Sequence, residues 1–463
     1  MRTDKMGSVG QHVEASAWMR TAGGYGKRSY RAYVPHPLKG WDPVLNADDL
    51  EALTAADRAL ISILSLPWTD MGASIADWMT ARDESIRSSM IEGVVSTESG
   101  LAWARYLDAA GRAVSDENDA LTLGAAKQIT HAVNLGAQMK ADGACRLDDV
   151  LDLHRALFAG TRDRAIGGVL RDEPIWVGPP GCLVDDATFV APPPDRVPGL
   201  MSDLIEYLNA SRHPAPLKAA VAHAQFETIH PFEDGNGRTG RALIHTVLNA
   251  ADAARGAVPI STTLSDNRRT YYDALHAAQS VECDRSDALA RSAALRSWLR
   301  VFNRACQDAA QAAAASARRV EAISTRWQAA GQFRRDSAAA RLLPLLPSMP
   351  VLDAEMVAKR LGISRKAARR ALNSLESTGI VGATGGRRHR RYHTPDLVSV
   401  LRRMGPDGGP AGVGRGSRAD APAPAPGRAV PLRQQCQHIG VRSERRCRLP
   451  AGHEGQHRYP PDE

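Results

Sequence analysis

Twelve consecutive residues, His230 to Arg241, combine side chains that can bind phosphates, hold a metal and remove a proton. They read His-Pro-Phe-Glu-Asp-Gly-Asn-Gly-Arg-Thr-Gly-Arg. His230 has the pKa range of a general base, and Asp234 offers the hard oxygen that Mg2+ prefers. Arg238 and Arg241 are three residues apart, so on a helix they share a face and can bind a polyphosphate together. The segment therefore indicates a site for a nucleotide, a metal and a proton acceptor.

The flanking elements explain how these side chains would be positioned. Apolar residues at helical spacing predict a helix over 217–228, which the next proline must end near His230. Gly235 and Gly237 let the backbone approach a ligand closely, and a second helix opens at Arg238. A glycine turn that leads into a helix N-terminus presents free N–H groups to an anion. Alone, Gly-Asn-Gly is typical of a turn and an arginine pair of a solvated face, but their coincidence favours a site.

The segment resembles the Fic-family signature, His-Pro-Phe-x-Asp/Glu-Gly-Asn-Gly-Arg-x-x-Arg, at every fixed position. Fic proteins are mostly helical enzymes that move a nucleotide monophosphate, usually AMP from ATP, onto a protein hydroxyl. The resemblance implies that this chain modifies a Ser, Thr or Tyr of a target protein or of itself. It also implies a base in His230, an Mg2+ ligand in Asp234, a phosphate cradle in Gly235, Asn236 and Gly237, and β- and γ-phosphate contacts in Arg238 and Arg241.

A second motif lies upstream, where residues 88–93 read Ser-Ser-Met-Ile-Glu-Gly. Ser88 and Glu92 are one helical turn apart, and Gly93 is a natural helix end. The hexamer by itself is typical of an ordinary helix end. Beside the signature it resembles the family's inhibitory helix, Ser/Thr-x-x-x-Glu-Gly/Asn, in its N-terminal placement. The resemblance implies that Glu92 pairs with Arg241, so that ATP binds unproductively; a reverse removal of AMP stays open.

Two further segments would complete the site. Residues 169–177 mix apolar and β-prone residues ahead of Gly-Pro-Pro-Gly and predict a short hairpin. It resembles the Fic flap, whose edge aligns the target's backbone by strand addition. A run of prolines then leads into a helix from about Val197. Residues 265–275 resemble the family's adenine-side segment, in which Tyr271 and Tyr272 would pack on the base; alternatively one is core and the other exposed.

Basic charge is concentrated at the C-terminal end. Residues 351–463 carry 21 Lys and Arg against 10 Asp and Glu, a net of +11, whereas the whole chain is +8. This asymmetry indicates a polyanionic partner for that end alone.

The basic end itself has a recognisable pattern. Residues 352–381 pattern two short helices around a glycine, which is a helix-turn-helix arrangement, and residues 380–392 predict a hairpin. Together they resemble a winged-helix domain, which binds DNA or serves as a protein-protein or dimerisation module. The expected DNA contacts are Arg365, Lys366, Arg369, Arg387, Arg388 and Arg390.

The tail carries a candidate zinc site. Cys436, Cys447, His453 and His457 follow the spacing Cys-x10-Cys-x5-His-x3-His. The first gap is too long for a common zinc finger, but the set could close a tetrahedral Zn2+ site. The alternative is two scattered thiols in a disordered tail.

The bulk properties set the organisation. A chain of 463 residues predicts two to four domains, and abundant alanine with few aromatics suits a helical fold. We find no signal-peptide pattern and no apolar stretch long enough for a membrane, and six cysteines do not form a disulfide framework, so we expect a cytoplasmic protein without a membrane partner. A homodimer stays open.

The expected fold class is mainly α: a Fic-type helical domain with a small β-hairpin flap, a winged helix-turn-helix domain and a zinc-binding-like tail. The predicted parts are an N-terminal extension (1–40), the Fic region (41–300), a connecting helix (301–334), the winged helix-turn-helix domain (335–403), a linker (404–433) and the zinc tail (434–463).

Two other functions remain open from the sequence. The same fold could use a different donor and transfer UMP, phosphocholine or phosphate. Alternatively, the chain is a DNA-binding transcriptional regulator whose Fic part senses nucleotide or modifies the chain itself.

Overall fold

The computed structural model describes residues 10–21, 24–66, 69–179, 181–280, 286–386 and 390–398. Three predictions lie outside the described residues: the linker, the zinc-ligand set Cys436, Cys447, His453 and His457, and the DNA contacts Arg387 and Arg388. Most of the described chain is helical, so the mainly α fold class is confirmed.

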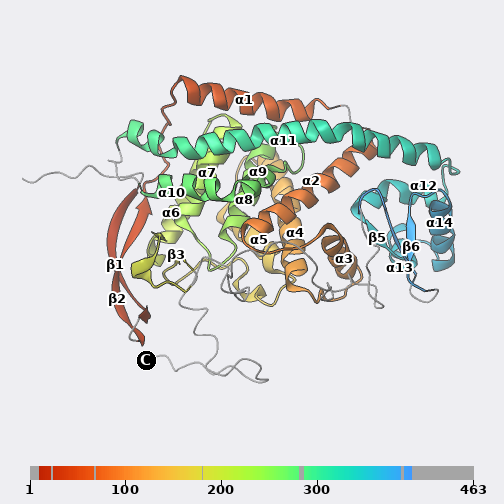
Figure 1. Ribbon diagram of the computed structural model, residues 1–463, viewed down its shortest axis with the longest axis horizontal. Coiled ribbons are helices and arrows are strands. Elements are labelled where there is room, and N and C mark those ends of the chain that lie inside the picture. The colour runs from red at the N-terminus through yellow and green to blue at the C-terminus, as the bar shows by residue number, and fades with distance from the viewer. Residues whose placement is uncertain are drawn as a thin grey trace, which may run out of the picture.

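Helices form the body of the molecule (Figure 1). They are α1 (Ala47–Leu64), α2 (Asp70–Ile91), α3 (Glu98–Ala109), α4 (Glu117–Asp142), α5 (Leu147–Phe158), α6 (Val197–Ala210), α7 (Ala215–Ile229), α8 (Asn236–Ala250), α9 (Ile260–Asp266), α10 (Arg268–Ser280), α11 (Ala288–Ala330), α12 (Ala338–Leu342), α13 (Ala354–Leu361) and α14 (Arg365–Ser377). Short 3-10 turns join them at η1 (Arg164–Ile166), η2 (Val184–Asp186), η3 (Pro194–Arg196) and η4 (Leu343–Ser348).

The strands form small antiparallel sheets at the edges of this body. One is a long hairpin, β1 (Gly10–Thr21) with β2 (Gly24–Pro35). The second joins two-residue strands, β3 (Trp176–Val177) and β4 (Phe189–Val190). The third has the order β5-β7-β6, from β5 (Val351–Leu352), β6 (Gly382–Thr384) and β7 (Arg391–His393).

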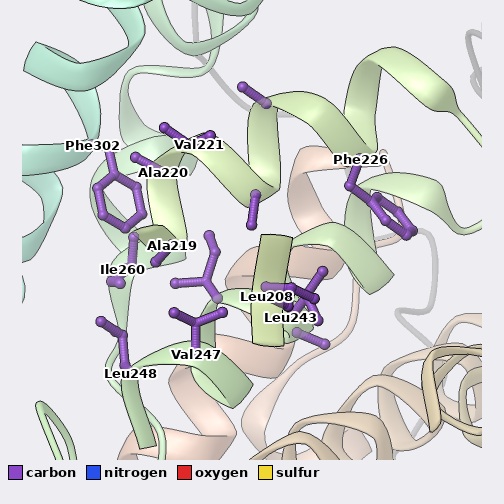
Figure 2. Packing of buried hydrophobic residues seen from close by; sticks show 14 of the residues in the cluster. Leu208, Ala219, Ala220, Val221, Phe226, Leu243, Val247, Leu248, Ile260 and Phe302 are labelled. Atoms are coloured by element: carbon purple, nitrogen blue, oxygen red, sulfur yellow. The ribbon is translucent and has the colours of Figure 1, made fainter. Parts of the chain in front are cut away.

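The core surrounds α7 and α8, which carry the twelve-residue signature between them. Every α7 residue except Lys218 is buried, as expected for a helix that is apolar on all sides. Its alanines let neighbouring helices approach closely. Figure 2 shows Val221 near Phe302 of α11, while Phe226 and Leu243 of α8 lie further along the same cluster. The signature loop therefore joins two rigid elements, which fixes its geometry.

Helix α11 is longer and more central than the sequence indicated. It begins at Ala288, inside the region assigned to the Fic part, whereas a connecting helix was expected from residue 301. Its first half packs into the core through Trp298 and Phe302, both fully buried. Figure 1 shows α11 running along α1 and reaching the C-terminal helices. The helix is therefore part of the core as well as a connection.

The N-terminal extension is a hairpin that packs on the flap region. The first half of β2 is mostly exposed, whereas Tyr30 and the last four residues, from Ala32 to Pro35, are buried. Tyr30 and Ala32 pack with Met19 against Trp176 and Val184. The hairpin therefore lies beside the β3–β4 sheet. The spacing of residues in the sequence did not predict this position.

The flap hairpin lies further along the chain than expected. Of the predicted strand over 169–177, only Trp176 and Val177 are extended in a ladder, and their partners are Val190 and Phe189. The earlier residues bond elsewhere, because the Arg171 backbone N–H donates to Pro231 O at 3.0 Å. The expected helix at Val197 is present as α6.

The C-terminal unit, defined here as the described residues 338–386 and 390–398, contains the helix pair expected over 352–381. Gly362 ends α13 with a left-handed φ of 65°, and Ser364 caps α14 by accepting from Ala367 N. Strands β6 and β7 form the expected hairpin. The assignment to the winged-helix class stays a prediction.

The C-terminal unit packs against α2 and α3. Ile75, Trp78 and Trp103 share one apolar cluster with Leu346 and Leu397. Among the described residues, no helix is long and apolar enough to cross a membrane.

Candidate active site

His230 sits at the C-terminal end of α7 in an uncommon backbone conformation. Its φ of 51° and ψ of 60° lie in the left-handed region, which non-glycine residues rarely adopt outside sites where the surroundings impose it. The Nδ1 atom lies 3.2 Å from the carbonyl oxygen of Glu227. A carbonyl can only accept, so Nδ1 carries the proton and Nε2 is the basic nitrogen. The conformation therefore prepares Nε2 to receive a proton.

Arg171 holds the loop after α7, and sequence reasoning missed it. Its guanidinium donates to the carbonyl oxygens of His230 at 2.7 Å, Pro192 at 2.7 Å, Glu173 at 3.0 Å and Ile229 at 3.3 Å. The side chain is buried, and burial lowers its pKa to about 10. A buried cation is tolerated here because backbone oxygens receive its donors. Arg171 thus joins the flap segment to the His230 backbone.

His154 and Asn236 fix the rest of the signature loop. His154 Nε2 contacts Asp234 O at 2.8 Å, and its ring stacks on Phe232 at 3.7 Å. Burial lowers the pKa of His154 to about 4, so the ring is neutral at pH 7. Asn236 bonds the backbone of Phe232 twice, accepting from its N–H at 2.9 Å and donating to its carbonyl at 2.8 Å. The Asn236 side chain therefore shapes the loop, while its expected cradle role is left to the backbone.

The start of α8 has the features of an anion site. Gly235 has a φ of 77°, and a Cβ there would collide with Leu157 and Phe158. Arg238 is buried, and its Nε and Nη1 have no hydrogen-bond partner among the described residues. Its Nη2 lies 3.5 Å from Asp234 Oδ1. Buried, unsatisfied guanidinium donors at a helix N-terminus favour a bound phosphate.

Arg241 is held by the second sequence motif. Its Nη2 donates to Glu92 Oε1 at 2.7 Å and to the Ser88 carbonyl at 2.9 Å, and its Nε donates to Ser88 Oγ at 2.9 Å. Burial alone would lower the pKa of Arg241, but Glu92, Tyr271 and Glu227 together raise the pKa above its usual value. Gly237 leaves room for Glu92, because a Cβ there would overlap the carboxylate. The pairing expected from the motif is therefore present.

The two tyrosines close one wall of the site. A cavity of about 690 Å3 is bounded by Glu92, His230 and Arg241 on one side and by Tyr271 and Tyr272 on another. The Tyr271 hydroxyl is buried near Arg241 Nη1 at 3.4 Å, whereas the Tyr272 hydroxyl donates to Ile91 O at 3.1 Å. The structure thus brings the signature, the second motif at residues 88–93 and the tyrosine segment together around one cavity.

Sequence reasoning also missed a buried acid and its neighbour. Glu227 lines the cavity, and its Oε1 has no hydrogen-bond partner among the described residues. Burial raises the pKa of Glu227 to about 8 and lowers the pKa of His223 to about 3. Glu227 is three residues before His230 in the chain, but only burial makes it unusual, and burial is not visible in the sequence.

The predicted DNA contacts within the described residues are all exposed. Arg365, Lys366 and Arg369 lie on α14, where Arg365 pairs with Glu355 at 3.2 Å. Arg390 pairs with Glu376 at 2.6 Å. Its neighbour Arg391 lies over the Trp103 ring at 4.8 Å and so faces the helical body.

Comparison with known sequences points to one family. Residues 144–248 match the model of the Fic/DOC family. The chain is 28% identical over 171 residues to the protein adenylyltransferase fic-1 of Caenorhabditis elegans, and 32% identical over 172 residues to the protein adenylyltransferase Fic of Culex quinquefasciatus. Each alignment covers 36% of this chain and 30% of the relative, so the chain matches less than a third of their length.

Solved structures of the same family are also similar to this chain. A Fic family protein from Desulfovibrio desulfuricans has 22% identity and a TM-score of 0.43, over 76% of this chain and 98% of that chain. Fic-1 from C. elegans has 20% identity and a TM-score of 0.45, over 59% of this chain and 73% of that chain.

Proposed function

Because residues 144–248 of this chain form a Fic/DOC family domain, we propose that the protein is an autoinhibited adenylyltransferase that moves AMP from ATP to a protein hydroxyl. One observation carries the proposal. The Glu92–Arg241 ion pair lies in the same cavity as the basic nitrogen of His230. Such a cavity holds the groups for transfer and, at the same time, a carboxylate that occupies one phosphate-binding cation.

The donor set fits a nucleotide triphosphate. The free N–H groups at the start of α8 and the unsatisfied donors of Arg238 are suited to phosphate oxygens. Asp234, whose side chain is 36% exposed, would hold Mg2+ between protein and phosphates, where the ion neutralises charge on the leaving group. A single carboxylate fits this role, because Mg2+ at a phosphate site takes most of its ligands from phosphate and water.

The transfer step follows from the position of His230. Its Nε2 removes the proton of a Ser, Thr or Tyr hydroxyl, and the hydroxyl oxygen then attacks the α-phosphorus of ATP. The new bond joins that oxygen to phosphorus, and the bond to the β-phosphate oxygen breaks. Pyrophosphate leaves, and the target keeps AMP. The flap strands β3 and β4 line the same cavity, so they lie where a target segment would enter.

Autoinhibition follows from the bonds already made by Arg241. Three of its five donors go to Ser88 and Glu92 and a fourth goes to the Tyr271 hydroxyl, so Arg241 cannot bind two phosphate oxygens without giving up one of these contacts. A γ-phosphate would also meet the negative charge of Glu92. ATP would therefore bind without the geometry that transfer needs.

Labelled ATP tests the proposal. The Glu92→Gly protein should label itself at least about tenfold more than wild type. This increase corresponds to about 1.4 kcal/mol for the contact of Glu92 with Arg241. The matched control is Glu92→Gly combined with His230→Ala, which should not label. Intact-mass measurement after incubation with Mg2+ and ATP, UTP or CDP-choline identifies the donor, and release of AMP from labelled protein reports the reverse reaction. Equal labelling of wild type and Glu92→Gly would contradict autoinhibition.

We propose a second function for the C-terminal unit, binding of duplex DNA. The exposed cations Arg365, Lys366 and Arg369 occupy the first turns of α14, the helix that would enter a major groove in a helix-turn-helix protein. Their exposure supports this role, and the net charge of the C-terminal end points the same way. The two functions are compatible, because the α14 cations and the cavity are separate.

A further inference from the structure

Helix α2 presents a polar stripe that extends beyond the inhibitory motif. Glu84, Ser88 and Glu92 are four residues apart, so they lie on one face of the helix and its end. The facing helix α8 offers His245 and Arg241 at the same spacing. The stripe runs antiparallel, with Glu84 at His245 and Ser88 and Glu92 at Arg241. The Glu92 contact is thus one end of a longer seam between the two helices.

Glu84 is a buried carboxylate with partners on two other elements. Only 1% of its side chain is exposed. Its Oε1 accepts from Ser261 Oγ at 2.5 Å, and its Oε2 accepts from the Ser261 N–H at 2.9 Å. His245 Nε2 lies 3.2 Å from Oε1, but the two atoms do not meet hydrogen-bond geometry. The Val258 N–H donates to His245 Nδ1 at 3.5 Å, so the ring proton is on Nε2, the nitrogen near Glu84.

The contact with Ser261 also supplies a missing helix cap. Helix α9 begins at Ile260, and its N-cap residue Pro259 has no side chain that can accept a hydrogen bond. Glu84 accepts the free N–H of Ser261 instead, and its negative charge lies at the positive end of α9. A carboxylate from α2 therefore completes a helix more than 170 residues away in the chain.

Two of the helices that Glu84 contacts lie at the cavity, since Gly237 and Arg241 of α8 and Glu92 at the end of α2 line it. Helix α9 leads directly into α10, which carries Tyr271 and Tyr272. The Tyr272 hydroxyl returns to α2 at Ile91 O, one residue before Glu92. At the exposed side, Arg87 of α2 pairs with Asp266 of α9 at 2.9 Å. Helix α2 is therefore bonded to both α8 and α9, and Glu84 is the buried point where the three meet.

From these contacts we propose that Glu84 is a positioning residue, which seats α2 on α8 and α9 so that Ser88 and Glu92 engage Arg241. A buried carboxylate is stable only where donors surround it, so Glu84 permits one register of α2 on α8. A slip or rotation of α2 would leave Glu84 without Ser261 and His245. The inference rests on the proposed transferase for its activity readout, but the seating itself can be measured without activity.

The first test compares self-modification in two backgrounds. Glu84→Ala should raise labelling by labelled ATP at least about threefold over wild type, because the seat of α2 is lost. Adding Glu84→Ala to Glu92→Gly should not raise labelling further, since Glu92 no longer holds Arg241. Ser85→Ala is the matched control: Ser85 is equally buried on the same turn, but its hydroxyl bonds only within α2, to Ala81 O. This control should match wild type.

Two results would overturn the proposal in this assay. If Glu84→Ala labels itself as much as wild type, Glu84 does not position Ser88 and Glu92 on Arg241. A fall in both backgrounds would assign Glu84 a general structural role. Ser261→Ala removes a single hydroxyl from the same contact and should raise labelling in the same direction, which keeps the test decisive if Glu84→Ala does not fold.

The second test uses amide hydrogen exchange of the full chain. Exchange at residues 88–93 should be faster in Glu84→Ala than in wild type and unchanged in Ser85→Ala. Equal protection in Glu84→Ala and wild type would overturn the seating claim. If Glu92→Gly shows no labelling with any nucleotide, the proposed transferase fails, while the exchange data still decide whether Glu84 seats α2.

Discussion

Glu92 and Arg241 form a 2.7 Å ion pair although 149 residues separate them in the chain. The arginine is almost fully buried, and the hydroxyl and carbonyl of Ser88 accept from the same guanidinium. Gly237 admits the carboxylate, since any side chain there would overlap it. Arg241, for which we propose phosphate binding, is thus held by a helix outside the matched family segment.

Ser88→Ala should release Arg241 partly. The change removes the 2.9 Å bond from Nε but keeps the Ser88 carbonyl and Glu92 as acceptors. One buried charge-assisted bond contributes about 1.5–3 kcal/mol, and the contacts that remain still hold Arg241. The self-labelling rate of Ser88→Ala should therefore lie between the rates of wild type and Glu92→Gly. Initial rates with labelled ATP measure the order. Labelling above that of Glu92→Gly would contradict a supporting role for Ser88.

His230→Ala should stop transfer but spare nucleotide binding. Without Nε2 no positioned group takes the hydroxyl proton, and loss of general-base catalysis typically lowers the rate by about 10²–10⁴-fold. The α8 N-terminus and Arg238 remain in place to bind phosphates. Single-turnover labelling and calorimetric titration with ATP, both in the Glu92→Gly background, separate the two effects. An active His230→Ala protein would exclude His230 as the base.

Arg171→Ala should weaken both the fold and the transfer. The change leaves buried carbonyls of His230, Ile229 and Pro192 without their donor, at a cost of about 2–4 kcal/mol in the free energy of unfolding. The His230 backbone also loses its link to the flap, so the rate should fall more than ATP affinity. Denaturant unfolding and labelling in the Glu92→Gly background measure this. Arg196→Ala, at an exposed arginine of η3, is the control and should change neither the free energy of unfolding nor the rate of transfer.

The raised pKa of Glu227 predicts that stability falls as pH rises from about 6.5 to 8. In the unfolded chain Glu227 is already ionised in this window, whereas the folded chain keeps its proton up to about pH 8. The free energy of unfolding therefore falls by about 1.4 kcal/mol per pH unit, or by about 2 kcal/mol across the window. His223 and His154, whose pKa values are lowered to about 3 and 4, cost stability only below about pH 6.5.

Glu227→Gln should abolish that slope, because the amide does not titrate. The measurement is the free energy of unfolding of both proteins at intervals between pH 6.5 and 8. Parallel curves would show that Glu227 does not hold its proton in the folded state.

Arg365→Ala and Arg369→Ala should each reduce the salt dependence of DNA binding. If each side chain contacts one phosphate, each change lowers the slope of log affinity against log salt by about 1. Fluorescence anisotropy with a duplex over a salt series measures the slopes. Arg318→Ala, at an exposed arginine of α11, is the control and should leave the slope unchanged. Absence of salt-sensitive binding by the wild-type chain would argue for a protein-protein role of the C-terminal unit.

Local chemistry in the sequence determined the signature and its two helices. The proline and glycines after His230 break the chain there whatever surrounds it, and the apolar spacing on both sides specifies α7 and α8. The same local logic predicted a glycine between two short helices, which the structure places at Gly362, after α13. The spacing of Ser88 and Glu92 placed both on one helix face, and the family resemblance supplied their partner.

Tertiary structure alone decided which distant groups meet and how deeply they are buried. The flap strand is shorter than its β-prone sequence suggests, because Arg171 bonds the signature loop instead of a strand. Strands β1 and β2 lie on the flap region because Met19 and Tyr30 pack there with Trp176. Glu84, Glu227 and Arg171 look like ordinary surface charges in the sequence. A side chain's protonation and partners depend on its exclusion from water, which only the packed helices determine.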